Sequence, residues 1–275
     1  MSESISLRFL YNTVPGRVVL KVLTHPVISI VGGALLSTPL SAKAVQAYIK
    51  NNNIDMSRYE VPSKGFRSFN DFFTRKLKPE FLNYSDEAFA SPCDGLLTAT
   101  KIDSRSVFRI KNCDYRLGRL LRNKELAREF KGGTAFIFRL TPNHYHRYRF
   151  CADGIVSSRH RINGVLHCVR PIALEKLPIF IENSREYVVI GSKSMGDIVQ
   201  MEVGALMVGK IANNKKNRPG SMARVNAEKG YFEFGGSTII VLTKERRDLN
   251  PALLTREKNE EGEIPVGVGE KLFAD

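Results

Sequence analysis

The residues with the clearest capacity for chemistry are two glycines followed by two hydroxyl side chains, in the run Phe234-Gly235-Gly236-Ser237-Thr238. Two glycines before a serine allow the backbone a strained turn that other residues rarely adopt, and strain at a peptide bond can open its carbonyl to attack. Ser237 is thus placed to attack the carbonyl of the residue before it. An ordinary Gly-Gly hairpin turn has the same residues, so the motif alone leaves both interpretations open.

The segments around this motif predict strands. From residue 90 onward, short β-rich runs are separated by Gly, Pro and Asn, which is typical of strands joined by turns. The predicted strands are 134–140, 186–190, 198–203, 231–234 and 238–242, and the polar run 213–220 predicts a surface loop.

The first 80 residues are instead predicted to be largely helical, with segments at 17–36, 42–50 and 68–77. The last segment has one apolar stripe, which favours core packing, and Ser68 is its expected N-cap. The stripe consists of Phe69, Phe72, Phe73 and Leu77. Helices followed by strands favour an α+β fold, in which a helical N-terminal region precedes a mainly antiparallel β catalytic core.

The charge of the chain predicts an anionic partner. Its 275 residues include 42 Lys and Arg and 28 Asp and Glu, which gives a formal charge of +14. Residues 101–170 hold sixteen of the basic residues and five of the acidic ones. Acidic lipid and nucleic acid both fit this distribution, and so does a solvated basic surface, so charge does not choose between them.

The cysteines and the N-terminal sequence indicate a reducing compartment. The four cysteines, at positions 93, 113, 151 and 168, include no C-x-x-C pair, so neither a zinc ribbon nor a disulfide framework is indicated. The first residues lack the order of a signal peptide, which predicts that the protein is not exported. The most apolar stretch, 26–36, has eleven residues, whereas a spanning helix needs ~20.

Together with four further segments, the glycine–serine motif resembles the self-processing site of the phosphatidylserine decarboxylase family. The sequence Lys-Gly-Tyr-Phe precedes the motif, and the other segments occur in the order that the family has them. They are 68–73 with 75–79, 91–95, 139–147, and 203–205 with 208–209. The similarity extends from about Gly16 to Leu272, nearly the whole chain, and five ordered matches are much more specific than one.

The resemblance implies a pyruvoyl-dependent carboxy-lyase made as a zymogen. Ser237 would attack the carbonyl of Gly236 to give an ester, and β-elimination followed by hydrolysis would leave a covalent pyruvoyl group at position 237. The chain would then consist of a large chain, 1–236, and a small chain, 237–275. Phosphatidylserine would form a Schiff base with the pyruvoyl group, which accepts electrons as carbon dioxide leaves. The product would be phosphatidylethanolamine, so the reaction would be a step of phospholipid biosynthesis.

The resemblance also assigns roles to an aspartate and a histidine. A serine is a poor nucleophile unless a base takes its proton and a third group orients that base, and the family uses a histidine and an aspartate. Asp94 matches the aspartate, although a type I turn acid is expected from P-x-D-G alone. His146 matches the histidine of the decarboxylation site, where an imidazole can protonate the carbanion, although a structural histidine in a polar turn would fit the same position.

One residue departs from the family pattern. The family usually reads Tyr-His-Arg-x-His, and Arg149 stands where the second histidine, the base for self-cleavage, is expected. Arginine is a poor base at neutral pH. We therefore expect that His144 or His146 substitutes as the base, or that cleavage proceeds slowly through backbone strain and a shaped oxyanion site.

The implied substrate places the protein at a membrane surface. The lipid headgroup must reach residue 237 while the acyl chains stay near the bilayer, so we expect peripheral binding to an anionic membrane on its cytoplasmic face. Residues 17–36 and 101–170 are the expected contacts. Residues 1–80 are then a helical membrane-contacting region and residues 81–275 a β-rich catalytic domain. The resemblance also suggests a homodimer.

Three alternatives belong to other classes of protein. Loss of processing through Arg149 would leave an unprocessed family member that only binds anionic lipid. Nucleic-acid binding has no aromatic-rich or helix-based signature here, and no nucleic acid is expected as a partner. A metal-dependent hydrolase has no H-E-x-x-H or paired C-x-x-C to support it, so no metal is expected. Its ligands would come from His144, His146, Cys151, His167 and Cys168.

Overall fold

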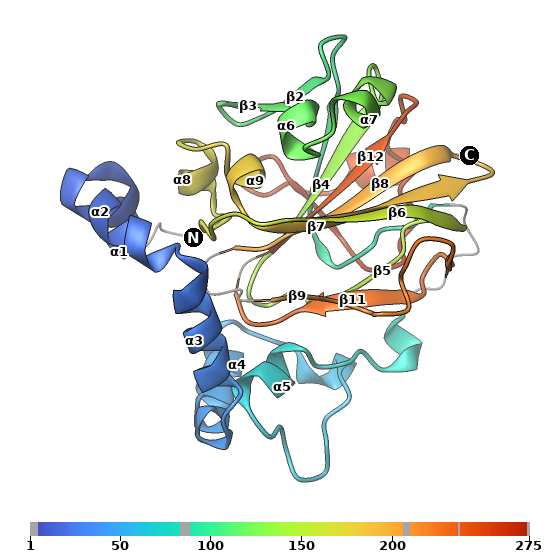
Figure 1. Cartoon of the computed structure of the whole chain (residues 1–275). Helices are drawn as coiled ribbons and strands as arrows, with labels where there is room; N and C mark the ends of the chain where they lie inside the picture. The colour runs from blue at the N-terminus through green and yellow to red at the C-terminus, as the bar shows by residue number, and fades with distance from the viewer. Residues whose placement is uncertain (1–4, 83–88, 206–209, 236, 274–275) are drawn as a thin grey trace.

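The fold is α+β, as the sequence predicts. The computed structural model of the chain describes residues 5–82, 89–205, 210–235 and 237–273. Helices dominate the N-terminal part, and strands dominate the chain from residue 95 onward (Figure 1). Every pairing between the strands of the described residues is antiparallel. The division into domains at residue 80 stays a prediction.

The helical elements of the N-terminal part are short. They are α1 (Ile5–Asn12), α2 (Val14–Leu23), α3 (Pro26–Leu36), the 3-10 helix η1 (Pro39–Ala44), α4 (Val45–Asn51), the 3-10 helix η2 (Met56–Arg58), α5 (Phe69–Phe73) and the 3-10 helix η3 (Pro79–Phe81). Later helices are α6 (Leu117–Leu120), α7 (Lys124–Glu129), α8 (Pro171–Leu174), α9 (Ile179–Glu182) and α10 (Pro251–Leu254).

The helix predicted over 17–36 is broken into two. α2 ends at Leu23, and α3 begins at Pro26. A proline fits there because the N–H groups of the first helical turn have no acceptor within the helix, so the N–H that proline lacks costs no hydrogen bond. Within the described residues, no single helix is long and apolar enough to cross a membrane. α2 and α3 together have the required length and composition, but they are bent by 63°.

The helix predicted over 68–77 is shorter than expected. Ser68 is its N-cap as predicted, since the hydroxyl accepts a hydrogen bond from the amide of Asp71 at 3.1 Å. α5 ends at Phe73 because the chain beyond it pairs with the segment after η2, through a bridge between Tyr59 and Leu77. The predicted apolar stripe is buried in one cluster all the same, so the expectation of core packing is confirmed.

The strands form one large sheet and two small ones. They are β1 (Gly95–Lys101), β2 (Val107–Ile110), β3 (Cys113–Arg116), β4 (Thr134–Leu140), β5 (Arg147–Arg149), β6 (Gly154–Ile162), β7 (Arg185–Ser192), β8 (Gly196–Val203), β9 (Ile211–Asn213), β10 (Met222–Ala223), β11 (Glu228–Phe232), β12 (Ser237–Thr243) and β13 (Ile264–Val266). The orders are β10-β6-β7-β8-β12-β4-β1-β13, β5-β11-β9 and β2-β3. All five predicted strands are present, the fourth one ending at Phe232.

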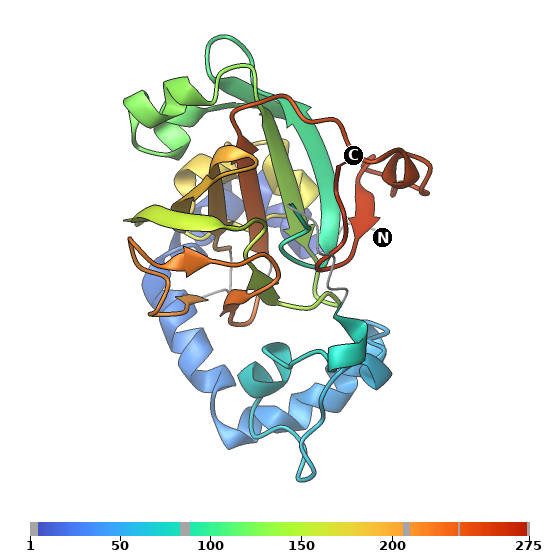
Figure 2. The same ribbon diagram turned by 90° about the vertical axis from the view of Figure 1, so that its right-hand side faces the viewer.

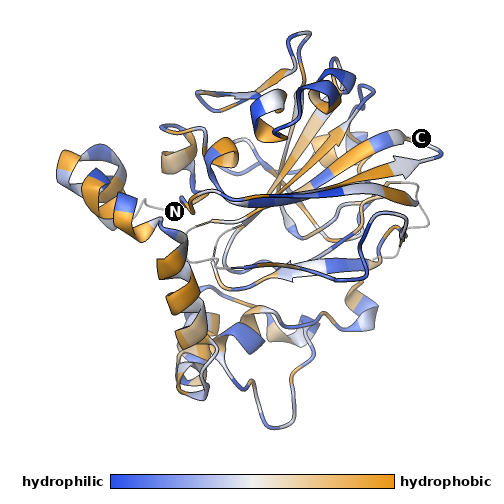
Figure 3. Ribbon diagram, in the orientation of Figure 1, coloured by the Kyte–Doolittle hydropathy of each residue, from blue (hydrophilic) through white to orange (hydrophobic). Residues whose placement is uncertain are grey.

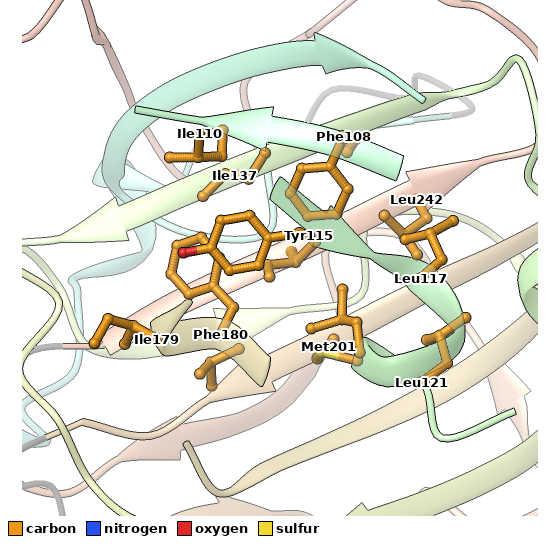
Figure 4. Close-up of a cluster of buried hydrophobic side chains, with 14 of the residues drawn as sticks. Phe108, Ile110, Tyr115, Leu117, Leu121, Ile137, Ile179, Phe180, Met201 and Leu242 are labelled. Carbon is orange, nitrogen blue, oxygen red and sulfur yellow. The ribbon is translucent and has the colours of Figure 1, made fainter. Parts of the chain in front are cut away.

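Both faces of the large sheet are buried at its central strands β4 and β12. Ile240 and Leu242 of β12 belong to a cluster covered by β2–β3 and helices α6 to α9 (Figure 4), whereas Ile239 and Val241 face a second cluster. Burial on both faces explains why β12 is a continuous apolar run. The three-stranded sheet lies between the large sheet and helices α3 to α5 (Figures 1 and 2).

Candidate active site

The large sheet brings three sequence-predicted site segments to one edge. β12, β4 and β1 are antiparallel neighbours, so the first residues of β12 and β1 lie at the end where β4 finishes. Ser237 begins β12 and is paired with Leu140, the last residue of β4. Asp94 immediately precedes β1, and the segment with His144 and His146 immediately follows β4.

The hydroxyl of Ser237 is enclosed by the protein and makes no hydrogen bond within the described part of the chain. The residue is 0% exposed. A buried polar atom without a partner is unusual enough to require an explanation. Gly235 has a φ of 135°, a conformation that a side chain would oppose. Gly236, the predicted acyl side of the cleavage site, lies outside the described residues.

His144 is oriented by the backbone next to it. Its Nδ1 accepts a hydrogen bond from the amide of Thr141 at 3.0 Å, so the proton of the neutral ring is on Nε2. Burial lowers the pKa of His144 to about 4, and the charges of Arg139 and Arg58 act in the same direction. The negative charge of the Asp94 carboxylate acts against this lowering of the His144 pKa.

His146 has the opposite proton arrangement. The ring is fully buried, and its Nδ1 lies 2.9 Å from the carbonyl oxygen of His144, an acceptor, so Nδ1 must carry the proton. Nε2 then has a lone pair and, within the described residues, no partner. Burial lowers the pKa of His146 well below its ordinary value, and the charge of Arg75 adds to the effect.

Asp94 is fixed by the C-terminal part of the chain. Its Oδ1 accepts a hydrogen bond from the amide of Val268 at 2.9 Å, and its Oδ2 lies 3.9 Å from Nη2 of Arg58. The acid is buried, so these contacts hold the carboxylate in one orientation. Asp94 therefore joins β1 to a segment 174 positions away rather than only closing the local turn.

Arg149 connects the three-stranded sheet to the large sheet. Its amide donates to the carbonyl oxygen of Pro92 at 2.8 Å, and its carbonyl oxygen accepts from Gln200 at 2.8 Å. Its guanidinium donates to the carbonyl oxygen of Asn226. The arginine thus ties β5 to the segment before Asp94 and to β8.

The sequence alone did not indicate that α5 supports the cleavage segment. Oδ1 of Asn70 accepts a hydrogen bond from the amide of Phe234 at 3.1 Å, and its Nδ2 donates to Gly33 and Ser37 at the end of α3. Phe73 packs against His146 with ring centroids 4.0 Å apart and the ring planes tilted by 37°, and its centroid lies 5.1 Å from that of Phe234. The one signal in the sequence was an amide side chain next to the aromatic residues of the apolar stripe.

We expect the change Asn70→Leu to slow chain scission by about tenfold, because the amide of Phe234 loses its acceptor three residues before Ser237. Scission is followed on denaturing gels of freshly made protein. Ser37→Ala is the matched control, since it removes a different bond of the same asparagine and leaves the one to Phe234. Scission of Asn70→Leu at the wild-type rate would show that Asn70 only stabilises the fold.

The other predicted polar residues lie elsewhere. His167 is on the segment before α8, and its Nε2 lies 3.4 Å from Oε2 of Glu182. Cys168 donates its amide to the hydroxyl of Tyr11, whereas Cys151 is buried in the cluster on the other face of the sheet. Within the described ranges, no three His, Cys, Asp or Glu side chains are grouped so that they could hold a metal ion.

Comparison with known proteins places the chain in a family. The family model described as phosphatidylserine decarboxylase matches residues 69–274. Phosphatidylserine decarboxylase proenzyme 2 of Clostridium acetobutylicum is 43% identical over 243 residues, which cover 87% of this chain and 81% of that protein. The phosphatidylserine decarboxylase proenzyme of Ruminiclostridium cellulolyticum is 39% identical over 243 residues, 86% and 80% of the two chains.

These similarities cover most of the chain and include the edge of the sheet described above. The chain belongs to the phosphatidylserine decarboxylase family, and it is therefore an enzyme of the carboxy-lyase class. The comparisons do not support the alternative of an unprocessed lipid-binding protein, because the relatives are named as proenzymes of a decarboxylase.

Proposed function

We propose that the chain is a zymogen that cleaves itself before Ser237 and then converts phosphatidylserine into phosphatidylethanolamine and carbon dioxide. The observation that carries this proposal is the buried hydroxyl of Ser237, which has no partner among the described residues and comes two positions after Gly235, a glycine with a positive φ. The names of the relatives, which are decarboxylase proenzymes, support both parts of the proposal.

Of the two candidate bases, His146 is better suited to take the proton of Ser237. The lone pair of His144 is engaged by the amide of Thr141, whereas Nε2 of His146 has a lone pair and no described partner. The depressed pKa of His146 keeps this nitrogen unprotonated at neutral pH. Asp94 then has an orienting role, because its charge acts on His144, whose carbonyl oxygen fixes the ring of His146.

The covalent pyruvoyl group of the family fits this position, since Ser237 presents a buried hydroxyl with no competing partner among the described residues. When formed, the group supplies an electrophilic carbonyl that captures the substrate amine and takes up the electrons released with carbon dioxide. Nε2 of His146, which is unprotonated at neutral pH, can take a proton from the substrate ammonium as this becomes the attacking amine, and can later return the proton to the carbon that loses carbon dioxide. The ring of Phe73 packs against His146, which is fully buried, so the imidazole is shielded from solvent.

A denaturing gel and an intact mass of the purified wild-type protein test the proposal. We expect two chains, 1–236 and 237–275, with a blocked N-terminus on the smaller one. A single unbroken chain of 30.9 kDa after prolonged incubation would contradict the proposal.

We propose further that helices α2 and α3 bind the membrane surface from the cytoplasmic side. Val14, Val18 and Val22 follow one face of α2 and are each at least 60% exposed. α3 also has exposed apolar side chains, among them Ile30 and Leu35, and most of its ribbon has the hydrophobic colour in Figure 3. Exposed apolar side chains on neighbouring helices are characteristic of a lipid or protein contact. The homodimer implied by the resemblance stays a prediction.

We expect the wild-type protein to sediment with phosphatidylserine vesicles at low salt and less well as salt is raised. The double change Val18→Glu and Ile30→Glu should weaken binding about tenfold per residue, since each removes a buried apolar side chain from the interface. Val61→Glu is the control, because Val61 is 55% exposed but lies outside these helices. Equal sedimentation of all the variants would contradict this placement.

A further inference from the structure

Arg75, two residues beyond α5, is a buried cation with little to neutralise it. The residue is 2% exposed, and its Nε and Nη1 have no partner among the described residues. Its Nη2 makes only long contacts with the carbonyl oxygens of Asn143 and His144, at 3.4 and 3.3 Å. The guanidinium carbon lies over the rings of Tyr59 and Phe72, 4.2 and 4.8 Å from their centroids.

Three other buried cations in the described part of the chain are satisfied more fully. Arg139 and Lys229 each pair with a buried glutamate, and Arg185 donates four hydrogen bonds to backbone carbonyl oxygens. A buried charge without such partners is costly, and stacking on aromatic rings recovers only a part of that cost. The two free nitrogens of Arg75 therefore indicate a site prepared for an anion.

Arg75 belongs to the wall of the candidate active site. Its Nη2 touches the segment that connects β4 to His146, and its charge contributes to the low pKa of that histidine. Phe73, the last residue of α5, packs against His146 with ring centroids 4.0 Å apart. Because Ser237 is itself 0% exposed, any amine that reaches it must bring the adjoining part of the lipid headgroup into a buried space.

We propose that Arg75 binds the phosphodiester of the lipid substrate, an inference that rests on the function proposed above. The phosphorus of a serine headgroup is four bonds from the amine nitrogen, so it enters the protein together with the reacting group. A phosphodiester taken out of water needs a cation. The guanidinium of Arg75 stays charged, and its Nε and Nη1, which have no partner among the described residues, can donate hydrogen bonds to phosphate oxygens.

The substrate carboxylate is a less suitable anion for Arg75. The carboxylate loses its charge as carbon dioxide leaves, so a guanidinium bound to it would stabilise the starting state more than the transition state. The phosphodiester keeps its charge throughout the reaction, and its binding therefore holds the substrate without opposing the chemical step.

The test is the change Arg75→Met, assayed with phosphatidylserine in detergent mixed micelles. We expect KM to rise about tenfold or more, with kcat changed by less than about threefold, because the lost contact is equal in the ground and transition states. Inhibition by the product phosphatidylethanolamine should weaken by the same factor, since the product retains the phosphodiester. Arg75→Lys keeps the charge but not the planar guanidinium, so its KM should lie between those of the wild type and of Arg75→Met.

Arg67→Met is the matched control, because it removes a positive charge from the same segment at a side chain that is 90% exposed. Each variant is first checked for division into two chains, and a wild-type chain that does not divide would defeat the proposed function itself. An unchanged KM in a fully divided Arg75→Met protein would overturn the phosphodiester site. Weaker substrate binding with unchanged product inhibition would indicate that Arg75 binds the substrate carboxylate, and this result would also overturn the phosphodiester site. If the Arg75→Met chain does not divide, KM and product inhibition of Arg75→Lys are compared with those of the wild type instead, and the same two outcomes would overturn the phosphodiester site.

Discussion

The change Ser237→Ala is expected to leave a single chain of 30.9 kDa that has no decarboxylase activity. The methyl group cannot attack the preceding carbonyl, so neither the second chain nor its electrophile forms. The fold should remain intact, because the hydroxyl of Ser237 makes no hydrogen bond to the described residues and its loss breaks no contact. Intact mass, carbon dioxide release and the thermal unfolding midpoint measure these three outcomes.

Thr238→Val provides the matched control for Ser237→Ala. Thr238 is the next residue of β12, and its Oγ1 is likewise buried without a partner in the described residues. Valine has nearly the same shape as threonine but lacks the hydroxyl. The variant therefore tests whether the loss of any buried hydroxyl at this place would stop division of the chain. We expect its chain to divide before Ser237. Division of Ser237→Ala at the same bond would refute the assignment of the nucleophile.

The parts of the fold that could be predicted are those whose local sequence has one interpretation. The prediction of 134–140 matches the bounds of β4, because this strand is buried along its whole length and is therefore mostly apolar and β-rich. β6 was missed because its burial pattern is irregular and it carries the exposed Arg161 and the partly exposed Arg159. The break between α2 and α3 had a local signal in Pro26, which the apolar character of the stretch obscured.

The site was only partly predictable because its geometry depends on the order of strands in the sheet. Ser237, Asp94 and His146 were named from motifs, yet their approach to one edge requires β12, β4 and β1 to be neighbours although they are far apart in the chain. The bond from Asn70 to Phe234 spans 164 positions, and the contacts of Arg75 span 68 and 69. No local pattern encodes such pairings, which arise when separate segments fold together.

The change His146→Gln is expected to slow chain scission by about 10²–10⁴-fold, the usual contribution of a general base. Glutamine can still donate a hydrogen bond to the carbonyl oxygen of His144, but it cannot accept the proton of Ser237. The control is His144→Asn, in which an amide oxygen can still accept from Thr141 and no proton acceptor of the reaction is lost. We expect that variant to lose less than about tenfold.

The pH dependence of wild-type scission separates this base from an ordinary surface histidine. The base is the neutral form of His146, and a depressed pKa preserves that form at lower pH, so the rate should stay constant through pH 6.5 and fall only below it. The change Arg149→His should accelerate scission and raise the pH of half-maximal rate, because a second imidazole would enter where the family has its base. A wild-type rate that halves near pH 6.5, with His146→Gln unaffected, would exclude His146 as the base and leave backbone strain at Gly235 as the remaining source of the reaction.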